Sequence, residues 1–205
     1  MSIHTNEKTF ISGHINGKTL AKAVLDGKTV YEGVKTTTYN YNDFYMYERL
    51  RTKAYVWSSY LVREKGGFNI PDGDTTIGQV GKINLGSNYG YRRTIVRFTK
   101  PTIAVADIKK VTLKTAYMSN PINVYGGTAN YSWTSGSEGY NLAGVLIGAL
   151  SGNTEYDITD VYKTMMESPA GHIYLKYVDT RGEGGADTST WWENFRMPSI
   201  IMQHK

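Results

Sequence analysis

Two turn dipeptides near the N-terminus constrain what this chain can fold into. Asn16-Gly17 and Asp26-Gly27 lie ten residues apart, and each is followed by a lysine and a threonine. Both dipeptides favour the type I′ turn of a β-hairpin, because this turn needs a positive φ at its two central residues. The residues between them, 18–25, would form one shared strand. The sequence therefore predicts a three-stranded meander within residues 1–34, which is too small to form a stable core of its own.

The remaining residues are numerous and apolar enough for a domain with a substantial core. The chain has 205 residues, of which 40% are hydrophobic and 17 are tyrosines. Tyrosine favours β-strands, and it also suits surfaces that are apolar and hydrogen-bonding at once. The chain has no cysteine, which excludes disulfide frameworks, thiolate zinc sites and cysteine nucleophiles.

The sequence shows no targeting or membrane segment. Residues 1–10 lack the apolar run of a signal peptide, and no stretch approaches the roughly 18–20 apolar residues of a membrane-spanning helix. We expect a protein that is made in the cytosol, is not secreted and has no membrane partner.

The net charge of +5 raises the question of nucleic-acid binding. Arg49, Arg51 and Lys53 form an alternating basic strip, but the other charges are scattered. No helix-turn-helix and no aromatic RNA-binding signature is present. We therefore expect no nucleic-acid partner, and the same charge suits attraction to anionic cell-surface polymers.

The pattern after residue 43 is one strand after another. Aromatic-rich or alternating runs bounded by turns occupy residues 44–62, 75–85, 92–99, 108–118, 172–178 and 197–202. In the run 108–118, alternation places Ile108 on the face opposite Val111 and Leu113. Several short strands with glycine-rich turns predict an all-β fold, a β-sandwich or jelly roll spanning residues 44–205. The polar stretch 35–43 reads as a connector between it and the meander.

One helix interrupts this pattern after Asp157, which is placed to cap it. Its apolar residues recur at the spacing of a single helical stripe: Ile158, Val161, Tyr162 and Met165. Ser168-Pro169 and Gly171 end it, so the sequence predicts one short helix of about ten residues.

The order of these segments resembles that of a DNRLRE-type domain. The resemblance rests on the runs IGQVGKINLGSNYGYRRTIVRF, IKKVTLKTAYM and YDITDVYKTMMESPAGHIYLKY, within residues 75–205. The matching positions are Arg93, Val96, Phe98, Val111, Leu113, Asp157, Val161, Ile173, Leu175 and Lys176. This resemblance implies a jelly-roll module similar to carbohydrate-binding modules.

The N-terminal residues carry a second resemblance. They are similar to the "NGK–VAKVYVDGKLVY" segments at the ends of structural proteins of tailed phages that infect Gram-positive bacteria. This implies a tail or baseplate accessory protein in the virion, assembled in the host cytoplasm. The N-terminal module would attach to other virion proteins, and we expect a homo-oligomer.

Aromatic residues in loops supply the candidate saccharide sites, because a flat ring stacks on the apolar face of a sugar. The first cluster contains Tyr131, Trp133 and Tyr140 with the amide of Asn130 nearby. The second contains Asp187 and the adjacent pair Trp191-Trp192. Adjacent residues on a strand point to opposite faces, so one tryptophan should face the core and we expect Trp192 to be the platform.

Catalysis and metal binding have weaker support. No HExxH, GxSxG or Walker motif occurs, and the four histidines lack metal-ligand spacing. The acids Glu138, Glu155, Asp187 and Glu193 could form a glycosidase pair, but solvated loop acids are the simpler interpretation. Asp72 and Asp74 have the i, i+2 spacing of a calcium loop without its further ligands. A plain turn is the simpler interpretation there, so we expect no enzyme and no cofactor, with Ca²⁺ as the alternative.

The sequence thus favours a virion accessory protein that binds a host cell-wall saccharide without catalysis. Two alternatives remain at this point. One is a purely structural virion decoration or connector, and the other is an enzyme that degrades the surface polysaccharide.

Overall fold

A computed structural model describes residues 14–15, 18–19, 22–25, 28–52, 57–63, 77–85, 88–132, 135–182 and 190–205. The strands are β1 (His14–Ile15), β2 (Lys18–Thr19), β3 (Lys22–Leu25), β4 (Lys28–Glu32), β5 (Lys35–Asn40), β6 (Asp43–Thr52), β7 (Trp57–Arg63), β8 (Ile77–Leu85), β9 (Asn88–Thr99), β10 (Ile108–Lys114), β11 (Ile122–Gly127), β12 (Gly144–Leu150), β13 (Glu155–Asp157), β14 (His172–Asp179), β15 (Trp191–Arg196) and β16 (Ser199–His204). The helices are α1 (Gly136–Tyr140) and α2 (Thr159–Glu167), with a 3₁₀ turn at Val105–Asp107. The predicted all-β fold is confirmed.

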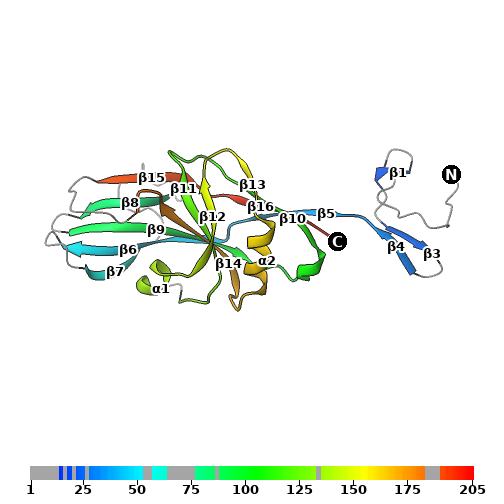
Figure 1. Ribbon diagram of the computed structural model, residues 1–205, viewed down its shortest axis with the longest axis horizontal. Helices are drawn as coiled ribbons and strands as arrows, with labels where there is room; N and C mark the ends of the chain where they lie inside the picture. The colour runs from blue at the N-terminus through cyan, green and yellow to red at the C-terminus, as the bar shows by residue number, and fades with distance from the viewer. Residues whose placement is uncertain are drawn as a thin grey trace.

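Two antiparallel sheets form the body of the molecule (Figure 1). The smaller has the order β13-β10-β16-β5. The larger has the order β12-β11-β14-β9-β6-β7, and β8 pairs with both β9 and β15. Apolar side chains of both sheets meet in one core, including Val111, Ile200, Val96 and Leu175. The structure is thus the predicted sandwich, with the larger sheet carrying most of the strands.

Helix α2 covers the core between the sheets, as its apolar stripe predicts. Ile158, Tyr162 and Met165 are buried. Asp157 Oδ1 accepts hydrogen bonds from the backbone N–H of Thr159, at 3.0 Å, and from its hydroxyl, at 2.6 Å. These bonds engage the first backbone N–H of α2 and lower the pKa of Asp157. The predicted helix is confirmed.

Strand β9 lies at the centre of the larger sheet and is buried on both faces. Val96 and Phe98 face the core between the sheets, whereas Tyr91 and Ile95 belong to a second apolar cluster on the outer face. Alternation along one strand therefore builds both clusters.

The structure differs from the expected connector at residues 35–43. Residues 35–40 form β5, which pairs with β16 from Lys35↔His204 to Asn40↔Ser199. Polar side chains suit this strand because it lies at the edge of its sheet, where one face and one backbone edge meet solvent.

Ile108 also departs from simple alternation. It is buried together with Val111 and Leu113, although it was expected on the opposite face. The register with β16 shifts between Ile108 and Lys110. A bulge of one residue reverses the alternation and turns Ile108 towards the core.

Near the N-terminus, β1 pairs with β2 and β3 pairs with β4. Residues 20–21, in the middle of the predicted shared strand, lie outside the described residues, so the meander stays a prediction. The pairs Ile15↔Lys18 and Leu25↔Lys28 flank the two turn dipeptides, which lie outside the described residues. Figure 1 shows β3 and β4 beyond the end of β5, away from the sandwich. The division into an attachment module and a sandwich domain stays a prediction.

Candidate functional site

Aromatic residues gather on the outer face of the larger sheet. Most of them come from its strands, although the sequence predicts the saccharide-binding rings in loops. The crossing segment, defined as residues 128–132 and 135–143, includes α1 and lies over this face, with α1 next to β6 and β7. Tyr140 and Leu142 from this segment pack onto Tyr47, Tyr91, Ile95 and Tyr174 from the strands. A Cβ atom at Gly139 would collide with the ring of Tyr47, so glycine is needed for this close approach. The crossing segment covers part of the face and leaves part of it open.

We define the tyrosine cluster as Tyr45, Tyr47, Tyr131 and Tyr174. Their rings form a continuous chain, with centroid distances of 6.5 Å from Tyr45 to Tyr47, 6.1 Å from Tyr47 to Tyr131 and 5.0 Å from Tyr131 to Tyr174. The rings meet edge to face or tilted, which is the geometry aromatic pairs prefer. Tyr45 and Tyr131 are partly exposed, while Tyr47 and Tyr174 are buried beside them. The cluster therefore offers individual ring faces rather than one flat platform.

Arg97 and His172 adjoin the tyrosine cluster. Arg97 on β9 lies opposite Asp43 of β6 and Tyr174 of β14 in the ladders. The His172 ring lies 5.9 Å from that of Tyr174. The patch thus combines phenol hydroxyls, a guanidinium and an imidazole within three neighbouring strands.

Burial favours the neutral forms of two tyrosines of the cluster and of His172. It raises the pKa of Tyr47 and of Tyr131 well above the ordinary value for tyrosine. Burial, and then the charge of Arg97, lowers the pKa of His172. At neutral pH the site presents uncharged hydroxyls and imidazole beside a cation, a set that can both donate and accept hydrogen bonds.

Only part of the first predicted aromatic cluster lies at the tyrosine cluster. Tyr131 joins the tyrosine cluster, and Asn130 lies next to it in sequence. The Asn130 amide is already engaged, because it donates to the Pro169 carbonyl at 2.8 Å and accepts from the Gly171 N–H at 3.0 Å. Trp133 lies outside the described residues.

Tyr140 differs from its expected role as an exposed platform. Its side chain is 1% exposed. The Arg93 guanidinium lies 4.1 Å from its ring centroid, and Arg93 also donates to the Tyr140 carbonyl at 2.6 Å. Tyr140 anchors the crossing segment to β9 and offers no free face to a sugar.

The second predicted cluster has the expected division between its tryptophans. Trp192 is 38% exposed, whereas Trp191 is half-buried. The Lys82 ammonium lies 5.0 Å from the Trp191 ring centroid and 4.9 Å from that of Tyr89. Asp187 lies outside the described residues. Trp192 is therefore the exposed ring of the pair, as expected.

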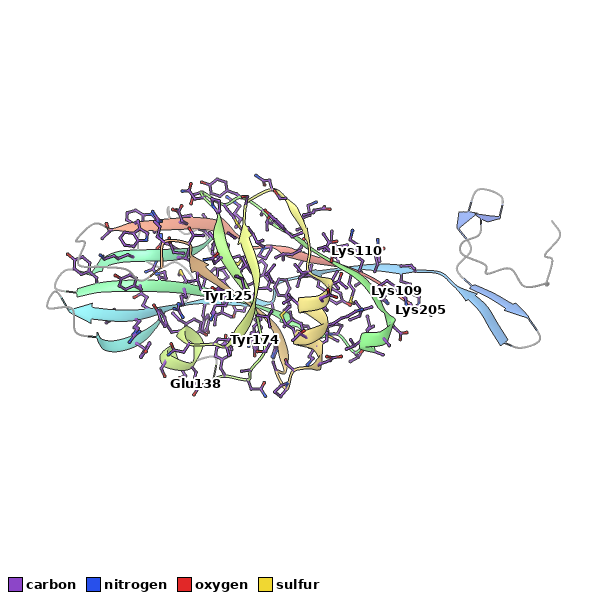
Figure 2. All side chains as sticks on the ribbon, viewed as in Figure 1. Lys109, Lys110, Tyr125, Glu138, Tyr174 and Lys205 are labelled. Carbon is purple, nitrogen blue, oxygen red and sulfur yellow. The ribbon has the colours of Figure 1, made fainter. Side chains whose placement is uncertain are left out.

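The candidate acids that the structure describes lie in different parts of the fold and have different hydrogen-bond partners. Glu193 is buried and bound to Ser119, Asn120 and Arg181. Glu138 on α1 accepts from the Ser132 N–H. Figure 2 shows Glu138 by α1, with Tyr174 and Tyr125 nearer the middle of the molecule and Lys109, Lys110 and Lys205 towards the C-terminal end. Glu155 is on β13, in the other sheet.

The described residues also offer little for binding a metal ion. Within the ranges that the structure describes, no group of three histidine, aspartate or glutamate side chains could hold a metal ion. Asp72 and Asp74 lie outside those ranges. Of the two described helices, neither is long and apolar enough to cross a membrane.

Sequence reasoning missed the strand residues of this site. Tyr45, Arg97 and Tyr174 lie on strands, whereas the sequence pattern indicates a saccharide site only at aromatic residues in loops. Their signal was available in the alternation that places Tyr45 and Tyr47 on one face of β6, opposite Met46.

The comparisons with known proteins assign no family to this arrangement. No family model matches the sequence, and no curated protein matches it.

Proposed function

We propose that this chain is a carbohydrate-binding protein without catalytic activity, and that it serves as an accessory protein of a phage tail or baseplate. The observation that carries the binding proposal is the tyrosine cluster beside Arg97 on the outer face of the larger sheet. Partly exposed phenol rings, here those of Tyr45 and Tyr131, can stack on the apolar face of a sugar, and their hydroxyls can exchange hydrogen bonds with its hydroxyls. Arg97 adds attraction for carboxylate or phosphate groups on a cell-wall polymer.

The virion part of the proposal rests on the N-terminal resemblance. Its support in the fold is the position of the β3–β4 hairpin beyond β5, apart from the sandwich (Figure 1). A partner bound by this hairpin would leave the outer face of the larger sheet accessible.

Binding of fluorescently labelled protein to purified Gram-positive cell-wall polysaccharide, and to whole cells, tests the proposal. We expect saturable binding that weakens about fivefold or more in Tyr131→Ala, because a stacked ring contributes about 1 kcal/mol or more. Trp133→Ala and Trp192→Ala, measured alongside, report on the loop aromatics. Tyr117→Ala is the matched control, because Tyr117 is an exposed tyrosine outside the cluster. Absence of binding to every polymer, or an equal loss in the control, would contradict the proposal.

A second candidate function, a structural subunit contact, is favoured by the exposed edge strand β12. Val145 and Leu146 on this strand are 42% and 53% exposed, and β12 carries no charged residue. Uncharged apolar edge strands pair readily with other chains. If this contact forms, sedimentation should show an oligomer that Leu146→Lys dissociates, whereas Val34→Lys, at another exposed apolar residue, should leave it intact. A monomeric parent protein would exclude this function.

A further inference from the structure

A groove at the end of the smaller sheet has the composition of a second ligand site, independent of the tyrosine cluster. It has a volume of about 520 Å³, within the range of small-molecule sites. Its floor is formed by half-buried and buried residues, namely Tyr41, Thr115, Ala116, Met197, Pro198 and Ser199. Its rim is formed by exposed polar side chains, namely Asn40, Lys114, Asn153 and Glu155. We refer to these ten residues as the groove.

The polar groups of the groove have unused hydrogen-bonding capacity. The side chains of Asn40, Tyr41, Lys114, Asn153, Glu155 and Ser199 make no hydrogen bond or ion pair with any residue that the structure describes. By contrast, the polar groups near the tyrosine cluster, such as Asn130 and Glu138, are bonded within the protein. Two amides, a phenol, a hydroxyl, an ammonium and a carboxylate therefore line the groove with only solvent to satisfy them.

The loop that forms one wall of the groove is held in a fixed shape. The Thr115 hydroxyl donates to the carbonyls of Ser151 and Thr154, at 2.8 and 2.9 Å, and accepts from the Thr154 N–H at 3.0 Å. The Asn153 N–H donates to the Ala116 carbonyl at 3.0 Å, and Asn153 has a left-handed φ of 56°. Asparagine tolerates this conformation better than most residues. The wall is thus in place before a ligand binds, which lowers the entropic cost of binding.

The charges of the groove indicate the class of ligand. Lys114 on β10 and Glu155 on β13 are direct cross-strand partners of opposite sign. Their sum is zero, so neither an anion nor a cation gains from the net charge. Hydrogen-bond donors and acceptors together, around a partly apolar floor with one phenol ring, match a neutral, hydroxyl-rich molecule. We propose that the groove binds a neutral sugar or related polyol, separately from any polymer bound at the tyrosine cluster.

Backbone NMR with ¹⁵N-labelled protein tests this directly, using glucose and N-acetylglucosamine as probes. We expect saturable shifts of the Ala116, Asn153 and Ser199 amides, with a dissociation constant on the order of 1 mM for so open a site. The variants Asn153→Gly and Glu155→Gln should each weaken binding about fivefold, the effect of one lost hydrogen bond. Glycine at position 153 keeps the left-handed backbone, so this variant removes the amide without straining the loop.

Glu167→Gln is the matched control for Glu155→Gln, because Glu167 is an exposed glutamate on α2 away from the groove. It should leave the affinity unchanged, and an equal loss in this control would overturn the proposal. Shifts confined to Tyr131 and Tyr174 would also overturn it, by placing the sugar at the tyrosine cluster. Glucuronate or glucosamine binding tenfold tighter than glucose would overturn the neutral-ligand assignment. Shifts at the groove with no polysaccharide binding would leave this inference standing while the proposed function fails.

Discussion

At the scale of single residues, the least replaceable pair is Arg92 and Glu48. Both side chains are fully shielded from solvent. Arg92 donates to Glu48 through Nε, at 2.9 Å, and through Nη2, and it also donates to the side-chain oxygen of Gln79. The side-chain amide of Gln79 in turn donates a hydrogen bond to the side-chain oxygen of Asn194 at 3.0 Å. A buried charge is tolerated only with such partners, because both ions lost their hydration on folding.

The variant Arg92→Met should lower the free energy of unfolding by about 3–5 kcal/mol, because Glu48 is left buried without its cation. Urea unfolding followed by fluorescence measures this. The double variant Arg92→Met/Glu48→Leu should recover much of the loss, since it removes both charges. A single variant that loses less than about 1 kcal/mol would contradict this account of the pair.

His172 makes the neighbourhood of the tyrosine cluster sensitive to acid. Its pKa is lowered in the folded protein, so the unfolded chain binds the proton more readily. Stability therefore rises with pH across the window between the lowered pKa and the ordinary value of about 6.5, and falls as the solution is acidified through it. NMR titration should place the His172 midpoint below 6.5. Arg97→Gln should raise that midpoint, and a midpoint at or above the ordinary value would contradict the assignment.

At the scale of elements, helix α2 depends on a glycine in the strand beneath it. A Cβ atom at Gly126 of β11 would lie 2.7 Å from a methyl group of Val161 and 2.8 Å from the sulfur of Met165. Both contacts are shorter than van der Waals packing allows. The helix therefore rests directly on the backbone of β11.

Gly126→Ala should lower the free energy of unfolding by about 1–3 kcal/mol, because the added methyl group pushes α2 off the sheet. Thermal and urea unfolding measure it. Gly171→Ala is the matched control, since a Cβ atom there has nothing within 4 Å. Equal effects of the two substitutions would show that α2 tolerates displacement.

The elements differ in how far the sequence could predict them. Helix α2 was predictable because local periodicity decides which of its residues are buried. Strand β14 was predictable as a strand, but alternation does not reveal that Tyr174 and Lys176 are buried on its outer face as well. Strand β5 was not, since its residues are polar and only the pairing with β16 makes it a strand. The bulge at Ile108 was hidden for a similar reason, because it depends on the register with β16. In the site, Tyr131 and Trp192 were found as loop or strand-start aromatics, but the burial of Tyr140 by Arg93 depends on tertiary contacts.

At the scale of the whole molecule, we expect the boundary between the hairpins and the sandwich to fall before β5, because β5 pairs with β16 in the smaller sheet. A chain beginning at residue 35 should unfold within about 1 kcal/mol of the full chain, because it keeps every strand of both sheets. A chain beginning at residue 42 should lose about 3 kcal/mol or more, since it removes β5 and uncovers β16. Urea unfolding of the two shortened chains measures the difference. Equal stabilities would show that β5 adds little to the sandwich.

The placement of β5 also has a mechanical consequence. This strand is the direct link between the hairpins and the body, and its six residue pairs with β16 lie along its length. If the hairpins are anchored and the far end of the sandwich is held by a ligand, tension runs parallel to β5. The hydrogen bonds along this antiparallel ladder then share the load in shear, whereas a pull across the strand would break them one after another. We therefore expect the molecule to resist unfolding when force is applied between its two ends.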